Sequence, residues 1–167
     1  MLRYAQSDHV TTIFRSISFL SLSMLGVTEI VFEILLAEDN PGDVLLFREV
    51  LNHQGLRCNL VVAADGQKAI SLLDDDAGST WRPDLIVLDV NLPKANGDAV
   101  LRHVRCQSWL NSVPVIMLTS SASPADRAVA MDLGATLYLQ KSSDLNELLD
   151  LGKVVETVLS RAGTPGT

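Results

Sequence analysis

Apolar and polar positions follow two different periods along the chain from about residue 30 onward. Short runs rich in Val, Ile and Leu predict strands, and DLIVLDV (84–90) is so continuously apolar that it predicts a central strand buried on both faces. The segments between these runs show the apolar spacing that is typical of helices with one buried face, and in the first of them the apolar positions are Val44, Leu45, Phe47, Val50 and Leu51. The predicted strands cover residues 30–37, 57–64, 84–90, 113–120 and 136–141, and the predicted helices cover residues 41–52, 66–75, 98–107, 124–133 and 144–161.

The order of these elements predicts the fold class. Five strands that alternate with five helices indicate an α/β domain, in which a doubly wound five-stranded parallel sheet carries helices on both faces through right-handed crossovers. We expect this domain to cover residues 30–161, with an exposed loop at 74–83 and a short tail at 162–167. The chain has 167 residues, enough to bury one sizeable core, and we expect no output domain after the last helix.

Residues 1–29 do not follow this pattern. The stretch IFRSISFLSLSMLGV (13–27) is apolar and rich in serine, but it is too short and too interrupted for a transmembrane helix. It has some features of a signal peptide, although no small-x-small cleavage site follows it. The segment is therefore a disordered or over-long N-terminal extension with Met24 as the true start, an additional helix, or a targeting segment. We favour the extension.

Composition and charge exclude several classes of protein. A hydrophobic content of 47% argues against a disordered chain, and a net charge of −7 gives no electrostatic reason to expect a nucleic-acid partner. Cys58 and Cys106 match no zinc or redox spacing, and His9, His53 and His103 form no clustered set of ligands. We expect reduced thiols, a cytoplasmic location and no membrane partner.

Functional groups gather where the predicted strands end. Glu38 and Asp39 follow the first strand, Asp89 ends the third, Thr119 ends the fourth and Lys141 ends the fifth. Ligands of doubly wound folds bind beyond the carboxyl ends of the strands. We therefore expect these five side chains to converge on one edge of the sheet.

The acidic pair is not needed to begin the helix that follows it. Asn40 is a suitable N-cap, Pro41 suits the first helical position, and Asp43 adds negative charge to the first turn. Glu38 and Asp39 are therefore available for another role. Each functional residue taken alone could be structural, but their joint placement indicates a site.

The chemistry of that site follows from its charges. Three carboxylates within a few ångströms repel one another, which raises their pKa values unless a cation compensates them. Oxygen ligands and retained waters suit Mg²⁺. A magnesium site of this kind attracts a phosphoryl donor, and a carboxylate can then act as the nucleophile and form an acyl phosphate. Lys141 would pair with the phosphoryl group, and the Thr119 hydroxyl would bind one of its oxygens.

Four motifs together resemble a known family. The acidic pair ED (38–39), VLDVNLPKANGD (87–98), MLTSSA (117–122) and the strand-end Lys141 resemble the bacterial response-regulator receiver domain in order and spacing. Thr119 lies 30 residues after Asp89, and Lys141 lies 52 residues after it. The resemblance covers about residues 30–161 and implies a flavodoxin-like (βα)5 receiver fold.

The resemblance also implies roles for the acidic residues. Asp89 would be the phosphoacceptor, which receives its phosphoryl group from a histidine kinase. Asp39, Asp89 and the backbone carbonyl of Asn91 would ligate Mg²⁺, and Glu38 would act mainly through water. Such a protein is not an enzyme in the usual sense, although it assists its own phosphorylation and dephosphorylation.

Three further positions complete the match, and one departs from it. Thr119 and Lys141 would bind the phosphoryl group, and Tyr138 matches the aromatic switch residue that turns inward when Thr119 moves toward the phosphate. The alternative for Tyr138 is an ordinary half-buried strand tyrosine. The family usually has Lys-Pro with a cis peptide bond where this chain has Lys141-Ser142, so we expect a trans bond that could change the placement of Lys141.

The subfamily suggests partners. The segments EDNPGDVLL, LPKANGDAVLRHVR and SSDLNELL are most similar to small single-domain regulators that are partnered with bacterial and cyanobacterial phytochromes. This similarity implies a sensor histidine kinase, with the phytochrome type as the first candidate, and a downstream protein or phosphotransfer partner. It also implies a homodimer through the fourth and fifth helices and the fifth strand.

Two alternatives share part of this pattern. A haloacid-dehalogenase-type phosphatase also forms an aspartyl phosphate, but it needs a second Asp two residues further on, where this chain has Asn91. A pseudo-receiver, which keeps the fold as an interaction module without phosphorylation, would show losses in the acidic set, at Thr119 or at Lys141. The sequence retains all of them.

Overall fold

A computed structural model describes residues 30–74, 81–120 and 123–163 of the chain, with only the backbone of residue 145. The predicted extension at 1–29 lies outside the described residues, as do most of the predicted tail, residues 75–80 of the predicted loop, and residues 121–122 of the MLTSSA motif. In the part of the chain that the structure describes, no helix is long and apolar enough to cross a membrane.

The described residues form a five-stranded parallel sheet. Its strands are β1 (Phe32–Ala37), β2 (Cys58–Ala63), β3 (Leu85–Asp89), β4 (Val115–Thr119) and β5 (Leu137–Gln140). Their order across the sheet is β2-β1-β3-β4-β5, and every neighbouring pair is parallel. Each residue of β3 and β4 is buried, as expected for strands covered on both faces. The predicted α/β class and doubly wound sheet are confirmed.

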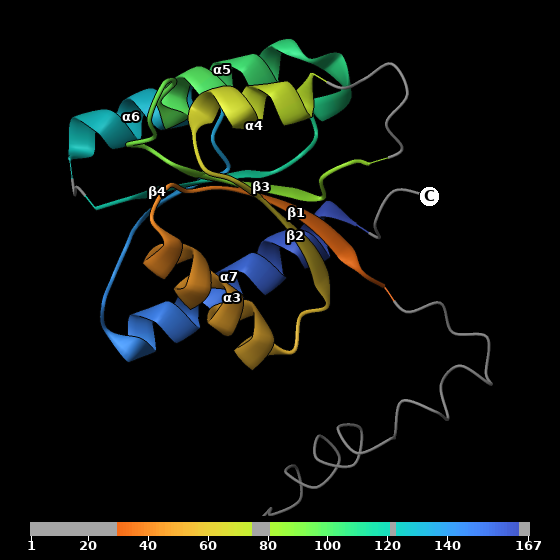
Figure 1. The fold of residues 1–167 in the computed structure, drawn as a ribbon, viewed down its shortest axis with the longest axis vertical. Helices are drawn as coiled ribbons and strands as arrows, with labels where there is room; N and C mark the ends of the chain where they lie inside the picture. The colour runs from red at the N-terminus through yellow and green to blue at the C-terminus, as the bar shows by residue number, and fades with distance from the viewer. Residues whose placement is uncertain (1–29, 75–80, 121–122, 164–167) are drawn as a thin grey trace, which may run out of the picture. The chain divides into compact units, whose positions relative to one another are not determined.

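Helices cover both faces of the sheet. They are α3 (Pro41–Gln54), α4 (Gly66–Leu73), α5 (Gly97–Cys106), α6 (Pro124–Asp132) and α7 (Leu145–Ala162), together with the 3₁₀ helix η2 (Ser108–Leu110). In Figure 1, α4, α5 and α6 lie on one side of the sheet, and α3 and α7 lie on the other. All ten predicted elements are present with bounds within two residues of those expected, whereas η2 was not predicted.

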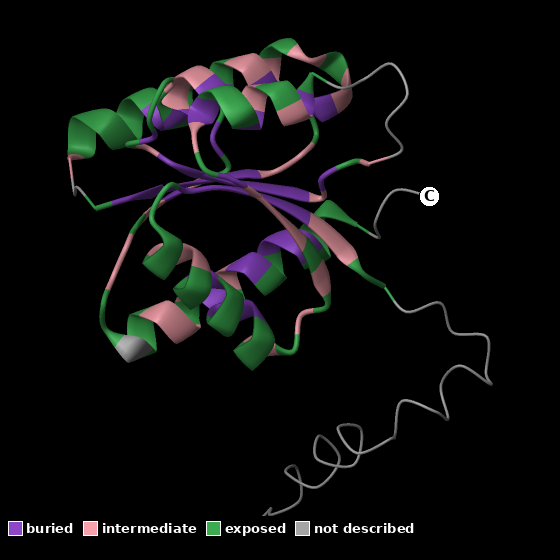
Figure 2. Cartoon of the chain, in the orientation of Figure 1, coloured by how far each residue is buried: buried purple, intermediate pink, exposed green. Residues whose placement is uncertain are grey.

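Each face of the sheet carries its own apolar core. One cluster joins α4, α5 and α6 to alternate strand residues such as Leu35 and Leu88, and the second joins α3 and α7 to their neighbours Ile34 and Val87. Figure 2 shows the buried strands between helices whose outer surfaces are exposed. Burying a side chain of this size contributes roughly 1.5–3 kcal/mol. The two cores therefore fix the strands, and with them the groups at the strand ends.

The first helix corrects one expectation from the apolar spacing. Phe47, Val50 and Leu51 are buried against the sheet, as their spacing indicates. Leu45, however, is 59% exposed, and its neighbour Leu46 is 46% exposed. The helix has room on the sheet for one stripe of side chains, and Leu45 lies outside that stripe.

Local contacts set where the helices begin relative to the strand ends. The Asn40 side chain accepts a hydrogen bond of 2.9 Å from the Gly42 amide, and Pro41 is the first residue of α3, so the predicted N-cap is confirmed. At the start of α5, a Cβ added to Gly97 would collide with the Asp89 carbonyl oxygen. Glycine at this position therefore lets α5 begin directly against the end of β3.

Candidate functional site

The register of the parallel strands brings the predicted residues to one edge of the sheet. Ala37 pairs with Leu88, so Glu38 and Asp89 lie side by side beyond that pair. Asp89 pairs with Leu118, the residue before Thr119. The Lys141 amide donates a hydrogen bond of 2.7 Å to the Thr119 carbonyl oxygen. The predicted convergence is thus observed in the backbone itself.

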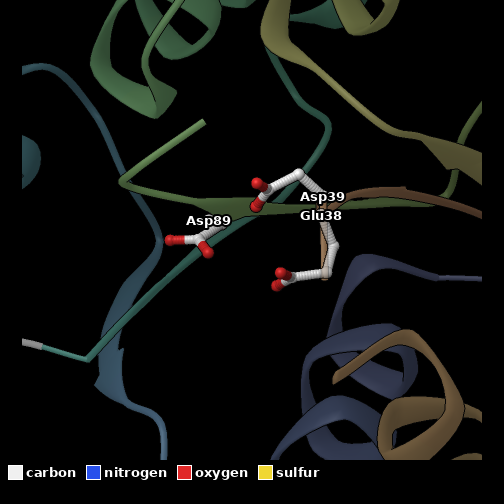
Figure 3. Close-up of side chains that lie close together, drawn as sticks. All are labelled: Glu38, Asp39 and Asp89. Carbon is white, nitrogen blue, oxygen red and sulfur yellow. The ribbon is translucent and has the colours of Figure 1, made fainter. Parts of the chain in front are cut away.

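Three carboxylates of this edge face a common space. Glu38, Asp39 and Asp89 each offer an oxygen, and these atoms all lie within 4.8 Å of one another. Figure 3 shows the three side chains close together at the ends of β1 and β3. Glu38 is 3% exposed and Asp89 is 6% exposed, whereas Asp39 is open to solvent. This is a set of hard oxygen donors that fits a divalent cation of the Mg²⁺ or Mn²⁺ kind, with an open side for retained water.

Lys141 supplies the positive charge of the site. Its Nζ lies 2.6 Å from Asp89 Oδ2, 2.7 Å from Glu38 Oε2 and 2.9 Å from Asp43 Oδ2. An ammonium group has three N–H donors and no acceptor, so each donor has a carboxylate partner. Lys141 therefore compensates the buried carboxylates, and it stands directly beside the proposed acceptor oxygen of Asp89.

Asp43 is the member of the site that the sequence did not identify. Its place in the first turn of α3 predicted a role at the helix terminus alone. The first turn after β1 also lies at the carboxyl edge of the sheet, and this brings the Asp43 carboxylate within reach of Lys141. That position in the fold was the signal that could have found it.

Burial controls the ionisation of the acidic side chain nearest the core. Burial raises the pKa of the Glu38 carboxyl above its ordinary value, against the hydrogen bonds from Lys141 and from the Asn40 amide, which lower it. Repulsion from Asp89 acts in the expected direction but is the smallest of these causes. The mutual repulsion predicted from the sequence is thus present, and desolvation outweighs it.

The lysine responds in the opposite way. Burial lowers the pKa of the Lys141 ammonium, but its hydrogen bonds to Asp43, Asp89 and Glu38 together outweigh burial and raise that pKa above its usual value. Beneath the ammonium, a cavity of about 70 Å³ lies between α3 and α7 and is partly lined by Leu118 and Leu151. These apolar walls limit the screening of the ion pairs, so Lys141 stays charged.

The two carboxylate oxygens of Asp89 have different partners. Oδ1 accepts a hydrogen bond of 2.9 Å from the Asn91 amide, and Oδ2 accepts the bond from Lys141. These bonds hold the carboxylate in one orientation. Asn91 itself is exposed two residues beyond the end of β3, at the same edge of the sheet.

Thr119 and Tyr138 lie in the neighbouring strands. Thr119 ends β4 and is 1% exposed. Tyr138 is 6% exposed, and its ring belongs to the apolar core shared with α4, α5 and α6. The Tyr138 hydroxyl is buried and has no hydrogen-bond partner among the described residues. The side chain is therefore turned inward and is more deeply buried than expected, and its switch role stays a prediction.

Lys141 reaches the site although serine follows it in place of the usual proline. The described residues contain no cis peptide bond, so Lys141-Ser142 is trans as expected. The Ser142 hydroxyl accepts a hydrogen bond of 3.0 Å from the Asp144 amide, which begins the turn into α7. Lys141 reaches its three carboxylates with this trans connection in place.

Comparison with known proteins agrees with this geometry. Residues 34–152 match the response regulator receiver domain family. The chain belongs to this family. Receiver domains with a flavodoxin-like fold are also its structural neighbours, so the resemblance drawn from the four motifs is confirmed.

Individual relatives within the family differ in how much of their length this chain matches. The chain is 34% identical over 126 residues to response regulator Rcp1 of Synechocystis sp., which covers 74% of this chain and 86% of Rcp1. It is 39% identical over 117 residues to the transcriptional regulatory protein CpxR of Escherichia coli, which covers 70% of this chain but only 46% of CpxR. The chain therefore matches most of the length of Rcp1 and less than half the length of CpxR.

Solved structures give the same result. The Mn²⁺-bound form of Rcp1 superposes with a TM-score of 0.71 at 33% identity and covers 81% of this chain and 99% of its own. The phosphorylated cyanobacterial phytochrome response regulator RcpA superposes with the same TM-score, identity and coverage. This receiver domain is thus similar to one protein solved with a divalent metal and to another solved in a phosphorylated state.

Proposed function

We propose that the chain is a single-domain response regulator that accepts a phosphoryl group on Asp89 from a histidine kinase. One observation carries this proposal. Asp89, Glu38 and Asp39 bring carboxylate oxygens close enough together to hold a divalent cation, and Asp89 Oδ2 also bonds to the Lys141 ammonium. A carboxylate that is held beside an ammonium and a metal site is suited to act as a phosphoryl acceptor.

The residues present fit a resident Mg²⁺ ion. Asp39, Asp89 and the backbone carbonyl of Asn91 would hold the ion, and Glu38 would contact it mainly through water. When bound, such an ion neutralises the charge that develops on a transferring phosphoryl group. The open side at the exposed Asp39 gives the ion and the donor access to the site.

The chain's own residues perform the remaining tasks. A carboxylate oxygen of Asp89 attacks the phosphorus of a phosphohistidine, the new P–O bond forms, and the P–N bond breaks with its electron pair left on the imidazole nitrogen. The Lys141 ammonium, already 2.6 Å from Asp89, pairs with the phosphoryl oxygens as they arrive. The Thr119 hydroxyl at the end of β4 binds one of those oxygens. The protein thereby accepts and later releases its own phosphoryl group, and it does not turn over a separate substrate.

The output of this chemistry is a change of shape. Movement of Thr119 toward the phosphoryl group would couple to Tyr138 in the adjacent strand, and it would shift an existing equilibrium of α6 and β5. The contact of the Tyr138 ring with the core that includes Ala130 of α6 supports this route, because a change in the position of the ring would be transmitted to that helix. A signal of this kind passes to a partner through protein contact.

Two partners follow from the comparisons and the surface. The similarity to the phytochrome response regulator RcpA supports a phytochrome-type histidine kinase as the donor. A homodimer through α6, β5 and α7 is supported by Val129 and Met131 of α6, which are 44% and 41% exposed. Sedimentation of the purified protein before and after phosphorylation measures that association directly.

Phosphorylation itself is tested by incubating the protein with Mg²⁺ and acetyl phosphate, followed by intact mass measurement. The attacking Asp89 oxygen replaces acetate, so we expect one phosphoryl adduct that requires Mg²⁺ and is absent from Asp89→Asn. The absence of any Mg²⁺-dependent adduct on the wild type would instead support the pseudo-receiver alternative. Mass is a better readout than tryptophan fluorescence, because Trp81 bonds to Glu33 near the start of β1 and Trp109 lies in η2, both at the opposite edge of the sheet.

Thermal unfolding gives a second test of the metal site. Selective binding of Mg²⁺ to the folded state should raise the melting temperature. Asp39→Ala should abolish that rise, because the substitution removes a proposed ligand of the ion. Asp39 is exposed, so we expect the variant to fold normally. An undiminished rise in Asp39→Ala would place the metal elsewhere.

A further inference from the structure

The partners of Lys141 fall into two kinds. Glu38 and Asp89 also belong to the group of carboxylates that can share a cation, so they serve both the lysine and the metal site. Asp43 lies outside that group, in the first turn of α3, and its Oδ2 lies 2.9 Å from Lys141 Nζ. Asp43 is therefore the one of the three carboxylate partners of Lys141 that a cation in this group would not share.

The start of α3 fixes the Asp43 carboxylate. Its second oxygen, Oδ1, accepts a hydrogen bond of 3.2 Å from the Asn40 side-chain amide. The Asn40 side-chain oxygen in turn accepts the bond from the Gly42 amide that caps the helix. Hydrogen bonds thus run without a break from the N-cap of α3 to the Lys141 ammonium. Both oxygens of Asp43 are engaged, so its orientation is set by the helix terminus.

We propose that Asp43 is a positioning residue for Lys141 during phosphoryl transfer, an inference that rests on the function proposed above. A lysine side chain is a flexible four-carbon stem that carries a point charge. With Asp43 in place, the ammonium keeps one fixed partner while the metal site draws on Glu38 and Asp89, and it turns its other two donors toward the phosphoryl oxygens. Without Asp43, the stem must be ordered anew at each transfer.

A purely structural role for Asp43 makes a different prediction, and the chain provides a matched control for it. An acidic residue in the first turn stabilises any helix through the helix dipole. Asp126 holds the same position in α6, three residues after the Ser123 cap and two after Pro124, and it is exposed. Asp126→Asn therefore removes the same helix-end charge as Asp43→Asn, at a place where the carboxylate does not contact Lys141.

The experiment compares the wild type with Asp43→Asn, Asp43→Glu and Asp126→Asn. The rate of adduct formation with acetyl phosphate is followed by intact mass, at a Mg²⁺ concentration that saturates each variant in a separate titration. We expect Asp43→Asn to slow the reaction roughly tenfold. A 1 Å misplacement of a catalytic group can cost about 10²-fold, and we expect a smaller loss because Lys141 also bonds to Glu38 and Asp89. Asp43→Glu should recover part of the loss, and Asp126→Asn should react at the wild-type rate.

The outcomes separate this inference from the function on which it rests. If the wild type forms no Mg²⁺-dependent adduct, the proposed function fails and the role of Asp43 fails with it. If the wild type reacts and Asp43→Asn matches Asp126→Asn at saturating Mg²⁺, the positioning role alone is overturned. A loss in Asp43→Asn that Asp43→Glu does not recover at all would also overturn it, because the carboxylate would then not be the group that acts.

Discussion

Replacing Lys141 by methionine tests the electrostatics of the site most sharply. The substitution keeps most of the side-chain length and apolar stem but removes the ammonium. Glu38 and Asp89 are 3% and 6% exposed, so the loss leaves two buried carboxylates without their cation. A divalent ion can replace that charge from the other side of the same carboxylates. We therefore expect Lys141→Met to be less stable than the wild type without metal and to respond more strongly to Mg²⁺.

The expected loss of unfolding free energy in Lys141→Met follows from the burial of the ion pairs that Lys141 makes with Glu38 and Asp89. Removing one partner of a buried ion pair typically costs about 3–5 kcal/mol. The Lys141 side chain is 20% exposed, so solvent screens part of the interaction, and we expect a loss of roughly 2–4 kcal/mol. For a domain of this size the loss corresponds to a fall in melting temperature of roughly 6–12 °C.

The assay is thermal unfolding of both proteins in EDTA and across a Mg²⁺ series, with urea unfolding as a check on the free energy. Lys153→Met is the control, because Lys153 pairs with Asp150 on the surface of α7 and both side chains are 67% exposed. An exposed pair of this kind contributes at most about 1 kcal/mol. If Lys141→Met is as stable as the wild type in EDTA, or if its melting temperature rises no more with Mg²⁺, then Lys141 does not compensate the buried carboxylates.

Three other substitutions test separate parts of the structure. Tyr138→Phe removes a buried hydroxyl that lacks a hydrogen-bond partner among the described residues. We therefore expect the free energy of unfolding, measured in urea, to stay the same or to rise by up to about 1 kcal/mol. A clear loss of unfolding free energy would show that the hydroxyl is hydrogen-bonded. Gly97→Ala places a methyl group against the Asp89 carbonyl oxygen, so we expect a loss of roughly 1–3 kcal/mol in the same assay together with weaker Mg²⁺ binding; wild-type values for both would contradict the close packing. Burial raises the pKa of Glu38, so the metal-free folded state holds its proton to higher pH than the unfolded chain does. Stability should therefore fall, relative to Glu38→Gln, as pH rises from about 4.5 through the raised pKa, and parallel profiles of melting temperature against pH for the two proteins would contradict this.

The fold could be predicted because its signals are local and repeated. The fully apolar run at 84–90 predicted a central strand, and β3 lies between β1 and β4 with every residue buried. The start of α3 was equally clear, since Asn40 and Pro41 specify a cap and a first turn by their own chemistry. Exposure within a helix was harder to predict. Leu45 has the spacing of a buried residue, but the width of the contact between α3 and the sheet decides its exposure.

The site could be predicted where strand ends carry it, and not where a contact depends on side-chain reach. Glu38, Asp89 and Lys141 meet because parallel strands end at a common edge, which the sequence order implies. Asp43 joins them through the reach of the Lys141 side chain, whose Nζ lies 2.9 Å from Asp43 Oδ2. The position of Asp43 in the first turn after β1 makes this contact possible, but the sequence does not show which first-turn side chain the lysine contacts. The leading effect of burial on the pKa of Glu38 likewise depends on how deeply the strand end sits beneath its neighbours.

Asp89 is proposed to accept a phosphoryl group only when a metal ion is bound, and the position of that group in the modified protein can be measured. The protein is incubated with acetyl phosphate in Mg²⁺ or in EDTA, digested rapidly at a pH that preserves acyl phosphates, and its peptides are sequenced by tandem mass spectrometry. We predict a phosphoryl group on Asp89 in Mg²⁺ and none in EDTA. A modification at another residue, or equal labelling of Asp89 in the presence of EDTA, would show that Asp89 is not a metal-dependent phosphoryl acceptor.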